Sequence, residues 1–387
     1  MMSKALLRIR KLVGFFKKEY RTLNTIEISR NNLLRNLRYL SSINRRVKIA
    51  PVLKSNAYGH GIVEVAKVLD QVNAPFFCVD SLYEAYELLK ANIKTPILII
   101  GYTNPENFKV KKLPFSFAVF DLEMAKVLNK YQGGCGIHIF VDTGMNREGM
   151  PLNKLSHFLK EIKKIPNIKV EGLMSHLASA DDTKDPLNKI QIKNFQKALE
   201  ICKRSRIHPR WVHLANSDGL LYTSDVSSKS NNIARVGLAL YGISNNPNLK
   251  PVLTLKSKLI QIKKLNKGNR VGYGGTFTAK GSMVLGVLPI GYYDGVDRRL
   301  SNERSSSSNK GYVTVDEILC PIVGRVSMNI TTIDLAKVSN PQIGQEVVVY
   351  SDNPKDKNSI ENSAKICKTI PYVILIHLAA STKRVVV

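Results

Sequence analysis

The sequence has few cysteines and no long apolar run, and each absence excludes a class of protein. Among 387 residues, no two cysteines form a CxxC pair or lie at metal-ligand spacing from a histidine; the five are Cys78, Cys135, Cys202, Cys320 and Cys367. No metal site and no disulfide framework is therefore suggested, and we expect small buried thiols in a reducing cytoplasm. Because no apolar run approaches the roughly 20 residues of a membrane-spanning helix, we expect a soluble protein.

Acidic residues are also scarce, with 30 Asp and Glu against 58 Lys and Arg, which gives a net charge of +28. An excess of this size is compatible with nucleic acid, an anionic membrane or acidic ligands as partners. The basic residues are spread along the chain, without a basic run interleaved with aromatics. We therefore expect no specific nucleic-acid binding and attribute the excess to solvated helix faces.

The first 23 residues form a basic N-terminal extension with a different pattern. Seven Lys or Arg and one Glu occupy one face of a helical repeat within residues 1–22, and the apolar positions on the other face are Met2, Ala5, Leu6, Ile9, Leu12, Val13, Phe16 and Tyr20. The segment lacks the continuous apolar core of a secretory signal. A weak contact with an anionic membrane, an organelle-targeting role and a docked or frayed extension all remain open.

From about Arg46 to Ser244, within a first domain expected over residues 24–250, short apolar runs alternate with amphipathic helical patterns. Eight runs rich in β-branched residues are present: "VKIAPVL", "PFFCVD", "PILIIGY", "FSFAVFD", "GIHIFVD", "VEGLMSH", "RWVHLAN" and "IARVGLAL". Near-continuous apolar strands separated by helices are typical of a parallel sheet covered on both faces. Eight such units predict an α/β fold, a TIM-like (β/α)8 barrel. Residues 251–387 read as strands with polar, Gly-rich breaks, which predicts a C-terminal mainly-β domain.

Polar and basic residues follow the apolar runs, where the active sites of such barrels lie. After the runs come Lys54, Tyr58, Met145, Arg147, His176, Asn216 and Ser217, and within the last run lie Arg235 and Gly237. Taken singly, Lys54 is equally well a solvated strand end, and His176 a satisfied core histidine. Together, one lysine, two arginines and a histidine with no acidic partner at these positions favour a phosphorylated ligand.

Lys54 has an obvious use opposite a phosphate site. The loops after the seventh and eighth strands commonly hold phosphate in barrels, and Ser217 and Gly237 lie there. An amine can form a Schiff base with an aldehyde cofactor, and positive surroundings lower its pKa and expose the free amine.

Nine blocks of sequence, in order, carry a resemblance to a known family. They are "VLKSNAYGHG", "VDTGMNREG", "GLMSHLASADD", "HLANSDG", "ARVGLALYG", "VGYGGTFTA", "LPIGYYDGVDRRL", "VGRVSMN" and "TIPY". Over roughly residues 24–387 the chain resembles the bacterial alanine racemases, which depend on pyridoxal 5'-phosphate. The resemblance implies that the chain interconverts L-alanine and D-alanine and supplies D-alanine for peptidoglycan.

The resemblance also implies a role for each matching residue. Lys54 would bind the cofactor covalently and act as one of two acid/base groups, and Arg147 would contact the cofactor's phenolic oxygen and the substrate carboxylate. Arg235 would face the pyridine nitrogen, and His176 would link Arg235 to the second base. The remaining cofactor contacts would come from Tyr58, Asn216, Ser217, Gly237, Leu238 and Tyr372.

Tyr273 of "VGYGG" matches the second base, which in the family reaches the cofactor of the other subunit. By the same resemblance, the partner subunit would supply three substrate contacts, Tyr292, Met328 and Asn329. Two composite sites of this kind require a homodimer with two-fold symmetry.

Three positions depart from the family pattern. Phe140 stands where many members place a carbamylated lysine that fixes the arginine matching Arg147. Asn329 replaces a usual aspartate and Tyr293 a usual small residue, and both would reshape the mouth of the site. A racemase of serine or of a broader range of amino acids therefore stays an alternative, and a non-catalytic barrel that only binds pyridoxal phosphate is a more remote one.

Overall fold

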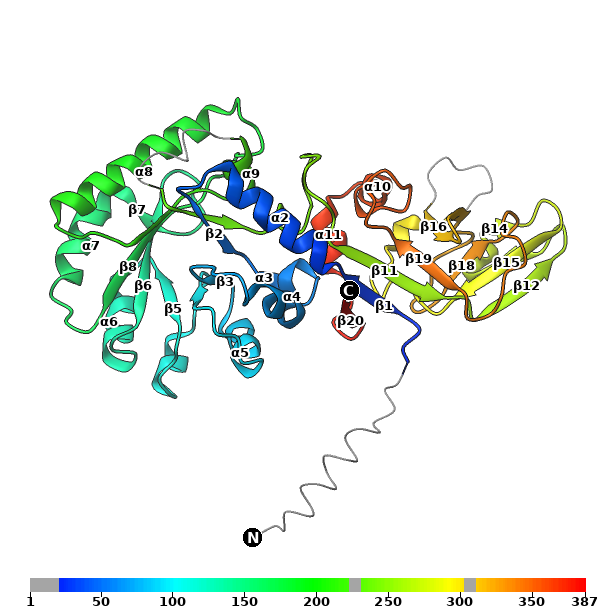
Figure 1. The fold of residues 1–387 in the computed structure, drawn as a ribbon, viewed down its shortest axis with the longest axis horizontal. Coiled ribbons are helices and arrows are strands. Elements are labelled where there is room, and N and C mark those ends of the chain that lie inside the picture. The colour runs from blue at the N-terminus through cyan, green and yellow to red at the C-terminus, as the bar shows by residue number, and fades with distance from the viewer. Residues whose placement is uncertain (1–20, 223–230, 303–310) are drawn as a thin grey trace, which may run out of the picture.

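The computed structural model describes residues 21–222, 231–302 and 311–387 and shows two domains side by side (Figure 1). The expected amphipathic helix of residues 1–22 falls almost wholly outside the described residues. Among the helices that are described, none combines the length and the apolar character needed to cross a bilayer.

Eight parallel strands form a barrel, as predicted. Six make one ladder from β3 to β9, and β10 pairs with β2. A parallel bridge from Val52 to Cys78 joins β2 to β3, and the Asn232 N–H donates to the Val212 carbonyl at 3.1 Å to join β10 to β9. The strands are β2 (Lys48–Pro51), β3 (Phe77–Val79), β4 (Ile97–Ile99), β5 (Ser116–Val119), β6 (Gly136–Asp142), β8 (Lys169–Met174), β9 (Trp211–His213) and β10 (Ile233–Val236).

Helices cover the outside of this ring. Side chains cap several of them: Ser81 accepts the Glu84 N–H, and Asp121 accepts the Met124 N–H. Between β4 and β5, where a Pro occupies the first turn, the connection is a short 3-10 helix, η1 (Pro105–Lys109), instead of an α-helix. The α-helices are α2 (Arg30–Ile43), α4 (Ile62–Leu69), α5 (Leu82–Lys90), α6 (Leu122–Tyr131), α7 (Leu155–Ile162), α8 (Pro186–Arg204) and α9 (Ser217–Tyr222).

The second domain is rich in strands, as expected, but it also holds two short helices that the strand pattern did not predict. These helices are α10 (Ile360–Ile366) and α11 (Pro371–Ile376). The strands are β11 (Leu253–Lys258), β12 (Gln261–Leu265), β13 (Arg270–Val271), β14 (Phe277–Thr278), β15 (Met283–Leu288), β16 (Tyr312–Val315), β17 (Ile318–Pro321), β18 (Thr331–Asp334), β19 (Glu346–Tyr350) and β20 (Lys383–Val386).

The strand β1 (Thr25–Ile28) precedes the barrel in sequence but lies in the sheet of the second domain. It pairs antiparallel with β11 and parallel with β20, within the order β17-β16-β19-β11-β1-β20. Its alternation of half-buried and buried residues suits a strand with one covered face. The first described strand and the last strand of the chain are therefore neighbours.

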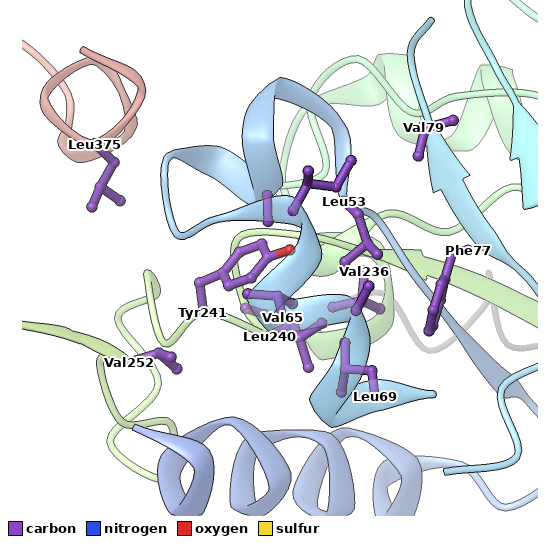
Figure 2. Packing of buried hydrophobic residues seen from close by; sticks show 14 of the residues in the cluster. Leu53, Val65, Leu69, Phe77, Val79, Val236, Leu240, Tyr241, Val252 and Leu375 are labelled. Atoms are coloured by element: carbon purple, nitrogen blue, oxygen red, sulfur yellow. The ribbon is translucent and has the colours of Figure 1, made fainter. Parts of the chain in front are cut away.

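Tyr241 is the centre of packing beneath the carboxyl end of β2. Its side chain is fully buried, its hydroxyl donates to the Val52 carbonyl at 2.9 Å, and its ring stacks on His60 with centroids 4.4 Å apart. Figure 2 shows Tyr241 beside Leu53, with Leu375 of α11 approaching from the second domain. The core is thus continuous from the barrel to α11 directly under Lys54.

Candidate active site

The carboxyl ends of the barrel strands surround a cavity of about 190 Å³. Nine of the residues predicted from the sequence line it: Lys54, Tyr58, Arg147, His176, Asn216, Ser217, Arg235, Gly237 and Leu238. They come from loops that are far apart in sequence, and the closed ring of strands brings them together. This is the face on which barrel enzymes place their chemistry.

Lys54 and Tyr58 are the first and last residues of one left-handed turn, α3 (Lys54–Tyr58). The four residues 55–58 all have positive φ, between 52° and 56°. Such a conformation costs L-residues about 1–2 kcal/mol each, so surrounding contacts must hold it. Asn56 supplies two of them: its N–H donates to Glu84 Oε1 at 3.1 Å, and its Oδ1 accepts the Ile62 N–H at 2.8 Å.

Opposite this turn, uncharged donors converge near the start of α9. Ser217 Oγ accepts the N–H groups of Gly237 and Ala239, both at 3.3 Å, which leaves the hydroxyl hydrogen free to donate. A Cβ on Gly237 would lie 2.9 Å from the Tyr58 hydroxyl, so only glycine allows this approach. Burial, with the nearby Cys78, raises the pKa of Tyr58 to about 12, so its phenol stays a donor. Donors of this kind suit an anion.

Arg235 forms the floor of the cavity and fixes the hydrogen positions around it. Its Nη1 donates to His213 Nδ1 at 2.8 Å, and its Nη2 donates to the Ser175 carbonyl at 2.6 Å and to His176 Nδ1 at 3.0 Å. A guanidinium cannot accept, so both imidazoles accept at Nδ1 and carry their proton on Nε2. His213 Nε2 then donates to His138 Nδ1 at 2.7 Å.

These histidines are neutral. Burial, and then the charge of Arg235, lowers the pKa of His138 and of His176 to about 3, and the same two causes lower that of His213. Burial lowers the pKa of Arg235 to about 10, which leaves the guanidinium charged at neutral pH. The floor of the cavity therefore carries one positive charge, that of Arg235, whose position is fixed by hydrogen bonds to neutral histidine rings.

Three acidic residues that the sequence reasoning missed also line the cavity: Asp80, Glu148 and Asp218. Lys54 Nζ lies 3.6 Å from Asp80 Oδ1, and Arg147 Nη2 lies 3.4 Å from Glu148 Oε2. Asp80 is the last residue of the run "FFCVD" and directly follows β3, so the rule that selected Lys54, inspection of strand ends, could have found it. The electrostatic character of the cavity mouth is therefore less uniformly positive than the sequence predicted, because these acidic side chains lie among the basic ones.

Comparison with known families decides what kind of protein this is. Residues 28–245 match the family model "Alanine racemase, N-terminal domain", and residues 252–386 match "Alanine racemase, C-terminal domain". The chain belongs to the alanine racemase family. An alanine racemase of Thermodesulfovibrio yellowstonii is 35% identical over 92% of this chain and 96% of its own, and one of Syntrophobacter fumaroxidans is 34% identical over 84% and 87%.

Solved structures of alanine racemases have the same fold. That of Clostridium difficile 630 superimposes with a TM-score of 0.87 at 28% identity, over 95% of this chain and 97% of that one. That of Bacillus anthracis, with bound L-Ala-P, gives 0.85 at 28% identity, over 95% and 96%. The chain is accordingly an alanine racemase-type isomerase with a small amino acid as substrate.

The site residues predicted in the second domain do not line this cavity. In the described residues, no lining side chain lies beyond Leu238. Tyr372 lies close by, on α11 packed against α3, and its charge is among the causes that raise the pKa of Tyr58. The other four, Tyr273, Tyr292, Met328 and Asn329, are exposed on the second domain.

Of the loops that carry these four residues, the one with Tyr292 is hydrogen-bonded to the one with Met328 and Asn329. The Tyr292 N–H donates to the Ser327 carbonyl at 3.0 Å, and the Tyr293 N–H donates to the Met328 carbonyl at 2.9 Å. Tyr273 begins η4 (Tyr273–Gly275) and is 73% exposed. The result is an aromatic and apolar surface without cover in the single chain.

Arg270, which the sequence reasoning also missed, holds the Tyr273 turn. Its Nε donates to the Gly275 carbonyl at 3.0 Å and its Nη2 to the Gly274 carbonyl at 2.7 Å. Both glycines have positive φ, the conformation that their lack of a Cβ allows.

Phe140, one of the three departures from the alanine racemase pattern, lines the same cavity as Arg147. Its ring is 6% exposed and packs with Ala118 and Met174. A phenyl ring offers no oxygen to a guanidinium, and the Arg147 side chain is 54% exposed beside Glu148. Arg147 is therefore paired toward the mouth of the cavity.

Proposed function

We propose that the chain interconverts L-alanine and D-alanine with pyridoxal 5'-phosphate held at the barrel mouth. The observation that carries the proposal is that Lys54, Arg235 and the Ser217–Gly237 donors line one cavity. When bound, the cofactor supplies an aldehyde that links to amines and a conjugated ring that withdraws electrons from the substrate's Cα. The donor chemistry fits this group, with a free hydroxyl hydrogen on Ser217 and a protonated phenol on Tyr58.

Arg235 favours racemisation over other reactions of this cofactor. A guanidinium donates one of its own hydrogen bonds to a ring nitrogen but does not readily release a proton to it. The ring is then a weaker electron sink than one protonated by an acidic partner. We infer that this restricts side reactions such as transamination and decarboxylation, which benefit from a protonated ring.

Two groups on opposite faces of the substrate would move the protons. Lys54 Nζ would take or return the Cα proton on one face, and Tyr273 Oη of the partner subunit would do so on the other. A free phenol has a pKa near 10, so Tyr273 needs help to hold a negative charge. The Nε2–H of His176, oriented by Arg235, is a suitable donor to that oxygen.

We propose a homodimer with two composite sites. The support is the exposed surface of the second domain, where Tyr273, Tyr292, Tyr293, Met328 and Ile330 are between 44% and 73% exposed. Exposed aromatic and apolar patches of this kind mark interaction surfaces. A two-fold axis would place each patch over the cavity of the other chain.

Mixing two inactive variants tests cofactor, mechanism and dimer together. We expect Lys54→Ala to lose the absorbance of the lysine-bound cofactor, and Tyr273→Phe to lose turnover while keeping that absorbance. After subunit exchange at equal concentrations, half of the dimers are hybrids with one intact site, so about a quarter of wild-type activity should return. No recovery in verified hybrids would rule out composite sites.

A racemase of serine or of a broader range of amino acids is the second candidate, because Tyr293 and Asn329 are exposed beside Met328. Comparing kcat/KM across alanine, serine and longer amino acids decides between them. Turnover of none of these amino acids by cofactor-loaded protein would leave only the cofactor-binding role.

We further propose a cytoplasmic location and a supply of D-alanine for peptidoglycan. The support for the location is that the five cysteines are free. A weak membrane contact through residues 1–22 stays a prediction. Salt-sensitive binding to anionic vesicles, lost on deletion of this segment, is its test.

A further inference from the structure

We propose that Arg384, in the last strand of the second domain, is a positioning residue for the Lys54–Tyr58 turn and thereby sets the affinity of the barrel for its cofactor. The inference deepens the proposed function and rests on Lys54 as the cofactor lysine. Arg384 does not line the mouth cavity, so it acts through the backbone that carries Lys54 and Tyr58.

One edge of the Arg384 guanidinium is hydrogen-bonded to the end of the turn. Arg384 Nε and Nη2 both donate to the Gly59 carbonyl, at 3.0 and 2.9 Å. Gly59 is the C-cap of α3, with φ of +83°, and its N–H donates to the Ser55 carbonyl at 3.0 Å. Arg384 therefore binds the residue that closes the strained segment.

The other edge binds the chain that leads into β20. Arg384 Nη1 donates to the Ala379 carbonyl at 3.0 Å and to the Thr382 carbonyl at 2.9 Å. β20 pairs with β1 in the sheet of the second domain. One rigid, planar group thus joins the cofactor turn of the barrel to the second domain of the same chain.

Two glycines make room for this contact. A Cβ on Gly61 would lie 2.7 Å from Arg384 Cδ, and a Cβ on Gly59 would lie 2.0 Å from the Leu375 carbonyl oxygen. Figure 2 shows Leu375 on α11 facing the packing around Leu53, the residue before Lys54. The turn is enclosed by backbone and by the arginine stem, which is the arrangement that a strained segment requires.

Loosening the turn would weaken cofactor binding, because the turn carries two of the proposed cofactor contacts. Lys54 would hold the aldehyde and Tyr58 the phosphate, and both belong to residues 54–58. Its four left-handed residues relax toward ordinary backbone unless the contacts at Gly59, Asn56 and His60 oppose them. Arg384 supplies two charge-assisted hydrogen bonds in this set and Glu84 a third, and bonds of this kind are the stronger ones.

The test is a titration of apoprotein with pyridoxal phosphate, following the absorbance of the lysine-bound form. Arg384→Lys keeps the charge, but a single ammonium group cannot bond to the Gly59 carbonyl and to the Ala379 and Thr382 carbonyls in the way that the planar guanidinium does. We expect the Kd of this variant for pyridoxal phosphate to rise about 10- to 100-fold. The matched control is Arg299→Lys, in the same domain, which loses a bidentate contact with Asp297. Its Kd should equal that of the wild type.

Hydrogen exchange gives a second readout that needs no cofactor. In the Arg384→Lys apoprotein, the amides of Ala57 and Gly59 should exchange faster than in the wild type, with the strands of the barrel unchanged. Should Arg384→Lys not fold, Arg384→Gln, which keeps an amide donor without the charge, replaces it in both measurements.

The outcomes separate this inference from the proposed function. A folded variant with wild-type Kd and wild-type exchange at the turn overturns the role of Arg384, even if its unfolding midpoint falls. If wild-type protein binds no pyridoxal phosphate, the proposed function fails, while faster exchange at Ala57 and Gly59 would still support Arg384 as the residue that positions the turn.

Discussion

Arg235 shows how one side chain fixes the state of several others. Because a guanidinium only donates, its bonds to His176 Nδ1 and His213 Nδ1 leave both rings with their proton on Nε2. His213 passes the same constraint to His138. In the proposed mechanism, a neutral His176 ring with its hydrogen on Nε2 would be a donor to Tyr273 of the partner subunit, and the direction of this bond would not depend on pH in the neutral range.

Replacement of Glu148 should increase the apparent affinity for the substrate. Its carboxylate lies 3.4 Å from Arg147, and in the proposed function it would compete with the substrate carboxylate for that guanidinium. Exposed pairs of this kind are worth about 0–1 kcal/mol, so Glu148→Gln should lower KM for alanine up to about 5-fold. Steady-state kinetics measures it, with Glu123→Gln, which breaks an exposed pair with Lys126, as the control. A higher KM would instead mean that Glu148 holds Arg147 in place.

At the scale of elements, the left-handed turn after β2 is the least ordinary segment. Its sequence contains no glycine between Lys54 and Tyr58, although all of residues 55–58 have positive φ. The turn survives because α5, α11 and β20 surround it. An element with poor local propensity is thus stabilised by tertiary contacts.

Gly59 and Gly134 have similar positive φ but different surroundings, so Gly→Ala substitutions at the two positions distinguish the cost of backbone strain from the cost of a steric clash. Gly59 has φ +83° and the Leu375 carbonyl in the path of a Cβ, whereas Gly134 has φ +90° and open space. Gly134→Ala should lower the free energy of unfolding by about 1 kcal/mol, and Gly59→Ala by about 2–4 kcal/mol. Urea denaturation measures both. Equal losses would show that α11 yields to the added methyl group.

At the scale of the whole molecule, the two domains are joined by the ends of the chain. β1 enters through the second domain's sheet before the barrel begins, and β20 returns to lie beside it. In the proposed dimer, each second domain would serve two sites, holding its own Lys54 turn through Arg384 and offering Tyr273 to the partner subunit.

Buried neutral histidines should make the fold acid-sensitive. Burial is the main cause that lowers the pKa of His60 to about 4 and of His138 to about 3. The unfolded chain binds these protons below its ordinary pKa near 6.5 and the folded chain does not, so stability is complete above pH 6.5 and falls as the pH drops toward 4. Each such histidine contributes a slope of up to about 1.4 kcal/mol per pH unit.

The urea midpoint of apoprotein at pH 7, 6 and 5 measures this slope. His60→Gln should reduce it, because one titrating group is removed, whereas His208→Gln, at an exposed position, should not. A midpoint independent of pH over this range would contradict the assignment of neutral buried rings.

The sequence by itself determined the number of barrel strands and which residues lie at or near their ends. Buried strands and amphipathic helices each leave a pattern of apolar residues that can be recognised within a short stretch of sequence. Lys54, Ser217 and Arg235 could be grouped on that basis, since parallel strands in a barrel end on one face. Only the tertiary structure decided the left-handed turn, the histidine tautomers, the place of β1 and the contacts of Arg384. Each of these depends on hydrogen bonds between residues far apart in sequence, which the local pattern of the sequence does not encode.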